Sequence, residues 1–125
     1  MIHTADRLLV ISTSTIHGYS FLAYIKDEIK EFIQTNELLF IPYAQPSGIS
    51  YEDYTQKVAE ALSSEGIKVK GLHEFEKKQK AIQQAKSIFI GGGNTFLLLK
   101  TLYELNLINE LREAVHRGTP YIGTS

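Results

Sequence analysis

Short apolar runs alternate along the chain with longer stretches in which apolar residues recur every three or four positions. The short runs predict strands, and the third of them alternates in a way typical of a strand nearer a sheet edge. The predicted strands are 7–12, 37–41, 67–72, 87–90 and 121–123. The stretches between them predict helices at 21–33, 51–64, 77–86, 96–103 and 108–115. Strands alternating with helices indicate the α/β class, a parallel sheet with helices on both faces.

This topology predicts where a site would lie. Right-handed crossovers place the carboxyl ends of parallel strands on one edge of the sheet, and ligands bind at that edge. The loops 12–20 and 42–50, the turn 91–94 and Ser125 are therefore expected to share one side of the molecule.

The turn Gly91-Gly92-Gly93-Asn94 separates a buried strand from a helix. Glycines allow backbone N–H groups to face outward, and a helix N-terminus adds donors and partial positive charge, so the turn is suited to an anion. A dinucleotide fingerprint would need glycine where Phe96 stands, and no phosphate-loop Gly-Lys-Ser/Thr follows. A purely structural turn remains an alternative. Asn94 and Thr95 are the candidate N-caps, and Asn94 is favoured for positioning the turn.

The final residues Gly123-Thr124-Ser125 match the first three positions of the Gly-x-Ser-x-Gly nucleophile elbow. Alone this match is weak, and a frayed end is the alternative. If strands 87–90 and 121–123 are neighbours, however, the glycine amides lie near the serine hydroxyl, as an oxyanion hole requires. The two segments together therefore predict an acyl-transfer site.

Composition narrows the class of protein. The length of 125 residues suits one domain. The sequence has 13 Lys and Arg and 14 Asp and Glu, and the resulting net charge of −1 argues against a nucleic-acid partner. The absence of cysteine fits the cytoplasm, no apolar run is long enough to span a membrane, and the start lacks the pattern of a signal peptide.

The histidines show no metal-ligand spacing. His73 and His116 are placed at opposite-edge or helix-end positions and His3 precedes the first strand. Only His17 falls in a loop on the expected active edge, where a solvated histidine is the simpler interpretation. Tyr43 and Gln45 follow the second strand and are candidates for lining a pocket, with a packed tyrosine and a turn glutamine as the alternative.

Five segments taken together carry a family resemblance, which runs from the first strand to the last residue. They are 12–15, 40–44, 51–55, 91–100 and 121–125. The chain resembles the N-terminal part of peptidase E, the α-aspartyl dipeptidases of the S51 serine peptidases, whose relatives include the cyanophycinases. The glycine–Asn–Thr–Phe stretch together with the terminal Gly-x-Ser is its specific part.

The resemblance implies a three-layer fold like that of the class I glutamine amidotransferases, with residues 1–125 as the N-terminal part of a longer peptidase domain. Ser125 matches the family's nucleophile and Gly93 the glycine that lends an N–H to the oxyanion hole, while Gly92 and Asn94 are candidate substrate-binding residues. The implied reaction removes an N-terminal aspartate from short peptides without metal or organic cofactor. A cyanophycinase-like hydrolase and a non-catalytic anion-binding module are the alternatives.

The resemblance also places the second oxyanion donor, the base histidine and its acidic partner later in the family's chain than Ser125. Residues 1–125 alone are therefore expected to be inactive, because a serine without its base is a poor nucleophile. Three accounts would explain why the sequence stops at the matched nucleophile: a longer enzyme broken after Ser125, a truncated product, or an incomplete sequence. In the first account, the C-terminal portion is expected as a bound second polypeptide.

Overall fold

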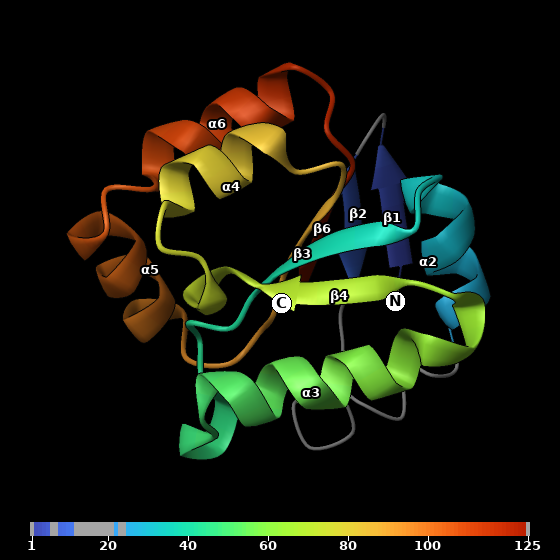
Figure 1. Ribbon diagram of the computed structural model, residues 1–125, viewed down its shortest axis with the longest axis horizontal. Coiled ribbons are helices and arrows are strands. Elements are labelled where there is room, and N and C mark those ends of the chain that lie inside the picture. Colours follow the sequence, from blue (N-terminus) through green and yellow to red (C-terminus); the bar gives the residue numbers. More distant parts are fainter. Residues whose placement is uncertain (1, 6–7, 12–21, 23–24, 125) are drawn as a thin grey trace.

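A six-stranded sheet lies between two layers of helices in the computed structural model, which describes residues 2–5, 8–11, 22 and 25–124 (Figure 1). The strands are β1 (Ile2–Ala5), β2 (Leu8–Ile11), β3 (Glu37–Ile41), β4 (Lys68–Gly71), β5 (Ile88–Ile90) and β6 (Tyr121–Thr124). Their order across the sheet is β1-β2-β6-β5-β3-β4. The predicted α/β class is confirmed, and β4 lies at an edge as its alternating sequence indicated.

Strands β2 to β6 are parallel, but β1 is antiparallel to β2, with Ile2 opposite Ile11 and Ala5 opposite Leu8. The purely parallel sheet of the sequence interpretation is corrected by this added edge strand. The segment Ile2-His3-Thr4-Ala5 is not an apolar run. It becomes a strand because it pairs with β2, and the periodicity of its own residues does not reveal this pairing.

The helices follow the predicted stretches closely. They are α2 (Lys26–Ile33), α3 (Tyr51–Leu62), α4 (Lys78–Gln84), α5 (Thr95–Glu104) and α6 (Ile108–His116), with short 3₁₀ turns η2 (Pro46–Gly48), η3 (Ser63–Glu65) and η4 (Leu72–Glu74). Gly66, with φ of +71°, ends the α3–η3 segment in the left-handed conformation that glycine tolerates best. The loop at 12–20 and residues 21 and 23–24 of the first predicted helix lie outside the described residues.

Each face of the sheet has its own apolar core because successive strand residues point to opposite faces. On one face, which we call the first-core face, Phe40, Phe89 and Ile122 pack with residues of α2 and α3. On the other, the second-core face, Leu39 and Ile88 pack with residues of α4, α5 and α6. The result is the expected three-layer arrangement, in which helices cover both faces (Figure 1).

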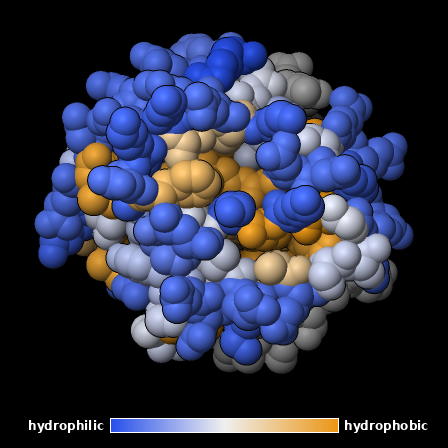
Figure 2. Space-filling model, in the orientation of Figure 1, coloured by the Kyte–Doolittle hydropathy of each residue, from blue (hydrophilic) through white to orange (hydrophobic). Residues whose placement is uncertain are grey.

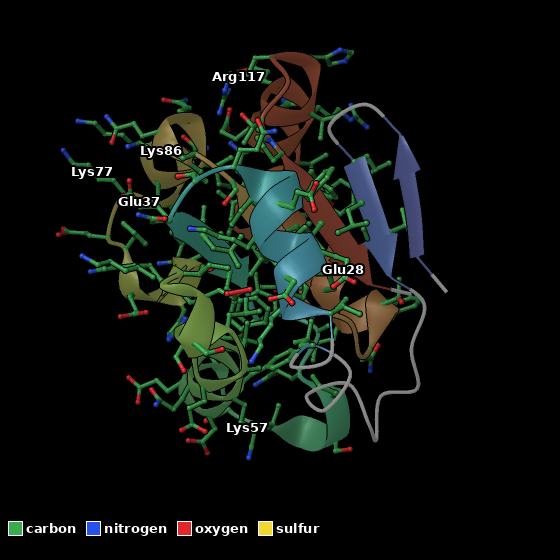
Figure 3. The ribbon with its side chains drawn as sticks, turned by 90° about the vertical axis from the view of Figure 1, so that its right-hand side faces the viewer. Glu28, Glu37, Lys57, Lys77, Lys86 and Arg117 are labelled. Atoms are coloured by element: carbon green, nitrogen blue, oxygen red, sulfur yellow. The ribbon has the colours of Figure 1, made fainter. Side chains whose placement is uncertain are left out.

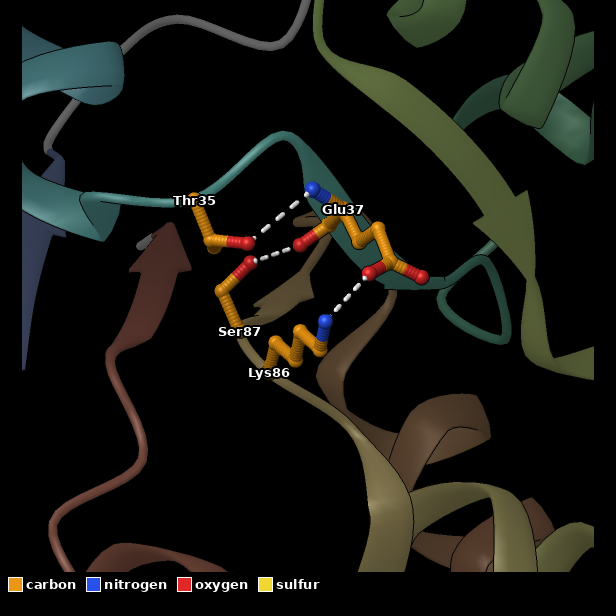
Figure 4. A network of polar contacts seen from close by, with 4 residues as sticks. All are labelled: Thr35, Glu37, Lys86 and Ser87. Carbon is orange, nitrogen blue, oxygen red and sulfur yellow. Dashed lines mark hydrogen bonds and ion pairs between the residues drawn. The ribbon is translucent and has the colours of Figure 1, made fainter.

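A small polar network fixes β5 beside the start of β3 (Figure 4). The buried Ser87 hydroxyl donates to the Glu37 carbonyl oxygen at 2.5 Å, and the Glu37 N–H donates to the Thr35 hydroxyl at 3.4 Å. Lys86 Nζ lies 2.9 Å from the Glu37 carboxylate, which lowers the pKa of that carboxyl. Because both charged side chains are exposed, this ion pair stabilises little, and the buried Ser87 bond is the structural anchor.

The charged side chains lie on the outside of the molecule. Figure 3 shows Glu28 on α2 and Lys57 on α3 pointing away from the sheet. Arg117 is different, because its guanidinium donates to the carbonyl oxygens of Ile82 and Gln83 at 2.8 and 3.0 Å and so caps the end of α4. Within the described ranges, no helix is long and apolar enough to cross a membrane.

Candidate active site

The glycine turn begins where β5 ends, and its first residue leaves no room for a side chain. The Gly91 N–H donates to the Ile41 carbonyl oxygen at 3.1 Å, so the turn starts in register with β3. A Cβ on Gly91 would lie 2.5 Å from the Tyr54 hydroxyl and 2.7 Å from Phe40 Cζ. Glycine is therefore required here by close packing.

The second glycine is held by a helix from the first-core face. The Tyr54 hydroxyl of α3 donates to the Gly92 carbonyl oxygen at 2.8 Å. The Tyr54 ring packs edge-on against Phe40, with the ring centroids 4.8 Å apart. This bond fixes the direction of the Gly92 peptide.

The third glycine is exposed and adopts a conformation that L side chains rarely enter, with φ of +146°. A Cβ on Gly93 would lie 2.8 Å from the Ala44 carbonyl oxygen and 2.9 Å from the Pro46 nitrogen. The backbone of the turn therefore packs directly against the loop that follows β3. Close approach and backbone conformation both demand glycine at the position that sequence reasoning matched to an oxyanion donor.

Asn94 ends the turn and begins α5. Its N–H donates to the Ala44 carbonyl oxygen at 2.8 Å, and its side-chain oxygen accepts from the Leu97 N–H at 3.0 Å. Asn94, and not Thr95, is therefore the N-cap, and its backbone bond to Ala44 also ties the end of the turn to the loop after β3. Its side-chain oxygen serves the helix, and a role toward substrate stays a prediction.

The turn and the end of β6 lie side by side, since β5 and β6 are neighbouring parallel strands. Ile88 is opposite Tyr121, Phe89 opposite Ile122 and Ile90 opposite Gly123. Continuing this register brings Gly91 level with Thr124 at the carboxyl edge. The strand neighbourhood that the acyl-transfer interpretation needs is therefore present, although Ser125 itself lies outside the described residues.

The loop after β3 supports the turn instead of offering side chains to it. Tyr43 is 1% exposed and packs edge-on against Tyr51, and the Gln45 amide donates to the Ile49 carbonyl oxygen at 3.2 Å. They are thus a packed tyrosine and a turn glutamine, as the alternative interpretation had it. Sequence reasoning missed the part played by the Ala44 carbonyl and by Tyr54, which in the sequence has only the spacing of a core residue.

The placement of His73 away from the carboxyl edge was wrong. His73 lies in η4, directly after the carboxyl end of β4, and its ring packs at Gly71 and beside Tyr51. Three strand spacings separate β4 from β6, about 14 Å, so His73 does not reach the end of β6. His116 ends α6, at a helix end as predicted, while the side chains of His3 and His17 lie outside the described residues.

Groups of metal ligands and hollows elsewhere in the described part of the chain can also mark a site. No group of three or more His, Cys, Asp or Glu side chains there is arranged to hold a metal. A hollow of about 330 Å³ lies between α4 and β4, with Lys68, Lys70 and Lys86 at its rim, and Figure 2 shows apolar atoms at its centre. Residues of β3, β4 and α4 line it, and none of the glycine-turn residues does.

Comparisons with known proteins agree with this arrangement. The model of the family described as "Peptidase family S51" matches residues 8–125. The chain is 38% identical to a "Probable alpha-aspartyl dipeptidase" of Drosophila melanogaster, covering 98% of this chain and 51% of that protein. It is 42% identical to "Peptidase E" of Shewanella sp. (strain W3-18-1), covering 94% of this chain and 50% of that protein.

Solved structures give the same result. A putative peptidase E protein from Listeria monocytogenes EGD-e superposes with a TM-score of 0.68 at 26% identity, covering 94% of this chain and 57% of that one. A peptidase from an acI-B1 Actinobacterium shares the fold, with a TM-score of 0.65 at 18% identity and coverage of 94% and 53%. The chain spans about half the length of the curated relatives it matches. The extent of the family match and these identities show that the chain belongs to peptidase family S51.

Proposed function

We propose that this chain carries the nucleophile and one oxyanion donor of a serine-type dipeptidase acting on peptides with an N-terminal aspartate. The family match and the printed names of the relatives, peptidase E and alpha-aspartyl dipeptidase, support this reaction class. The observation that carries the proposal is the register between β5 and β6, which brings the glycine turn beside the strand that leads to Ser125. An amidotransferase-like arrangement of the whole domain is part of the same proposal.

In the proposed mechanism, the Ser125 hydroxyl attacks the carbonyl carbon of the scissile peptide bond and loses its proton to a base. The base is a histidine supplied by the remainder of the family's chain, since a serine needs such a partner to be activated. The tetrahedral oxyanion accepts a hydrogen bond from the Gly93 N–H. Collapse breaks the C–N bond, the amine leaves with the proton, and water then hydrolyses the acyl-enzyme.

The packing of Gly93 supports its role, since an oxyanion donor must already be in place when charge develops. The close approach of the Ala44 carbonyl and Pro46, where no Cβ would fit, and the bond from the Asn94 N–H to that carbonyl restrict movement of the peptide. Gly92 and Asn94 are proposed to contact the substrate on the same edge. The positive end of α5 would favour the negative charge of an aspartyl side chain or of the oxyanion.

A chimera tests the reaction. Residues 1–125 are joined to the part of the Shewanella peptidase E that follows its match to Ser125, and hydrolysis of an aspartyl p-nitroanilide is followed. Activity should depend on the hydroxyl, so Ser125→Ala abolishes it while circular dichroism and thermal unfolding stay unchanged. A serine-directed phosphonate should label Ser125. A folded chimera that binds aspartate but is neither active nor labelled would support the anion-binding module instead.

The polypeptide of residues 1–125 by itself is proposed to be inactive. Of its four histidines, His73 is too far from β6 and His116 ends a helix. The same assay on the purified polypeptide should give no release of p-nitroaniline above the blank. Turnover well above the blank that is lost in Ser125→Ala would refute this part of the proposal.

A further inference from the structure

An apolar groove of about 460 Å³ runs between the sheet and the helices α5 and α6. Leu98, Leu99 and Val115 line it from the helices, and Tyr121 and Gly123 line it from β6. Leu99 is 46% exposed and Val115 is 47% exposed. Large apolar side chains left open along a continuous groove mark a surface that another element covers.

The neighbouring part of the sheet is open on the same face. Leu9 of β2 and Ile122 of β6 are buried on the first-core face, in the same cluster as Ile25 and Ile29. On the opposite face, Leu8, Val10 and Tyr121 are only half-buried. Within the described residues, a Cβ on Gly123 would meet only Tyr121 Cε1, at 3.6 Å. The described structure therefore has room above Gly123 for a larger side chain at this position.

The handedness of the fold indicates what crosses this open face. The connections that step toward β4 carry α2 and α3 on the first-core face, whereas those that step back, β4 to β5 and β5 to β6, carry α4, α5 and α6 on the second-core face. Right-handed crossovers give each direction its own face. A segment that leaves β6 and returns as a parallel strand toward the β1 edge is therefore expected to cross the second-core face, over β6 and β2.

The lengths of the relatives indicate which segment covers the groove. This chain spans 50% of the Shewanella peptidase E and 57% of the Listeria structure, so the family's fold contains nearly as much chain again. We propose that the groove between α5, α6 and β6, with the adjoining face of β2, is the docking surface for that remaining segment of the family's chain. The segment docks in the same way whether it is covalently attached or a separate polypeptide. The proposal rests on family membership and the topology, not on the proposed reaction.

Thiol accessibility tests the location directly, because the sequence contains no cysteine. Val115→Cys places a single thiol in the groove, and Leu105→Cys places a control thiol at a residue that is 39% exposed and lies outside the groove. Labelling rates are compared between the polypeptide 1–125 and its fusion to the remaining Shewanella segment. The groove thiol should react about tenfold or more slowly in the folded fusion, while the control thiol keeps its rate within about twofold, since reactivity follows exposure.

Unchanged labelling of the groove thiol in a folded fusion would overturn the proposal. So would protection of that thiol in the polypeptide 1–125 through dimerisation seen by sedimentation, because a second copy would then be the occupant. If the fusion does not fold, the segment is co-expressed as a separate polypeptide, and failure of both arrangements to give a folded complex also overturns it.

Gly123→Leu, combined with Val115→Cys, provides a second variant. The space above Gly123 predicts that the thermal midpoint of the polypeptide 1–125 hardly changes, while protection of the groove thiol in the fusion is lost. Retained protection would show that the segment does not pass over β6. A fusion that protects the groove thiol but hydrolyses no aspartyl peptide would contradict the proposed function and leave this surface intact.

Discussion

The Tyr54 hydroxyl and the Gly92 carbonyl oxygen, 38 residues apart in sequence, are joined by a 2.8 Å hydrogen bond between α3 and the glycine turn. The same hydroxyl fills the space that a Cβ on Gly91 would need. A helix on the first-core face therefore sets the position of the turn in which the proposed oxyanion donor lies.

Replacing Tyr54 with Phe removes this bond and keeps the ring against Phe40. We expect the free energy of unfolding to fall by about 1 kcal/mol, the usual net worth of one such bond. Denaturant unfolding measures it, and Tyr103→Phe is the matched control because Tyr103 is 67% exposed. In the active chimera, kcat should fall more than KM rises. Equal stability losses in the two variants would contradict a specific role for Tyr54.

Gly93→Ala tests the close packing of the turn. The added Cβ would lie 2.8 Å from the Ala44 carbonyl oxygen, at a backbone conformation that alanine avoids. We expect the free energy of unfolding to fall by about 2 kcal/mol or more, from strain and overpacking together. Gly48→Ala is the comparison, because Gly48 has a positive φ of +74° and nothing within 4 Å of its Cβ position. A loss no larger than that of Gly48→Ala would show that the loop after β3 does not hold Gly93 in place.

The Asn94 cap can be separated from a role toward substrate by two replacements. Asn94→Ala removes the acceptor for the Leu97 N–H and should lower the free energy of unfolding by about 1 kcal/mol. Asn94→Asp keeps an acceptor and suits the positive end of the helix, so it should retain the stability. A raised KM for aspartyl substrates in the Asp variant of the chimera would support substrate contact. Asn109→Ala, at an exposed position in α6, is the control for both.

Much of this fold follows from local sequence. The runs Leu38–Ile41 and Ile88–Ile90 are buried strands because they are wholly apolar, and α5 begins after the glycines, where Asn94 caps it. The glycine turn was recognisable as a special backbone because three glycines stand between a strand and a helix. These features depend on residues that are close together in the sequence, and periodicity and helix-capping patterns detect such local features well.

The contacts that position the site depend on residues distant in sequence. Tyr54 has the helical spacing of a core residue, and nothing local indicates that its hydroxyl reaches Gly92. The Ala44 carbonyl that accepts the Asn94 N–H is a backbone group, so the type of residue at position 44 does not indicate this bond. β1 was missed and His73 was misplaced for the same reason: strand pairing and sheet order, not periodicity, decide where they lie.

Tyr43 gives a prediction about alkaline pH. Its side chain is 1% exposed, and its hydroxyl has no hydrogen-bond partner among the described residues. Burial, with a smaller contribution from Tyr51, raises its pKa far above the ordinary tyrosine value. A tyrosine is neutral when protonated, so the folded state retains the proton at a pH where the unfolded chain has lost it. The resulting stability is complete below the unfolded pKa of about 10 and is lost as pH rises above it.

Tyr43→Phe should therefore raise the free energy of unfolding at neutral pH by about 1 kcal/mol, because an unpaired buried hydroxyl is removed. It should also make the loss of stability above pH ~10 less steep. Some loss should remain, since burial also raises the pKa of Tyr121. Urea unfolding from neutral to alkaline pH measures both effects, with the exposed Tyr103→Phe expected to show neither. A destabilised Tyr43→Phe variant would mean that the Tyr43 hydroxyl has a partner, such as a buried water, that stabilises the fold.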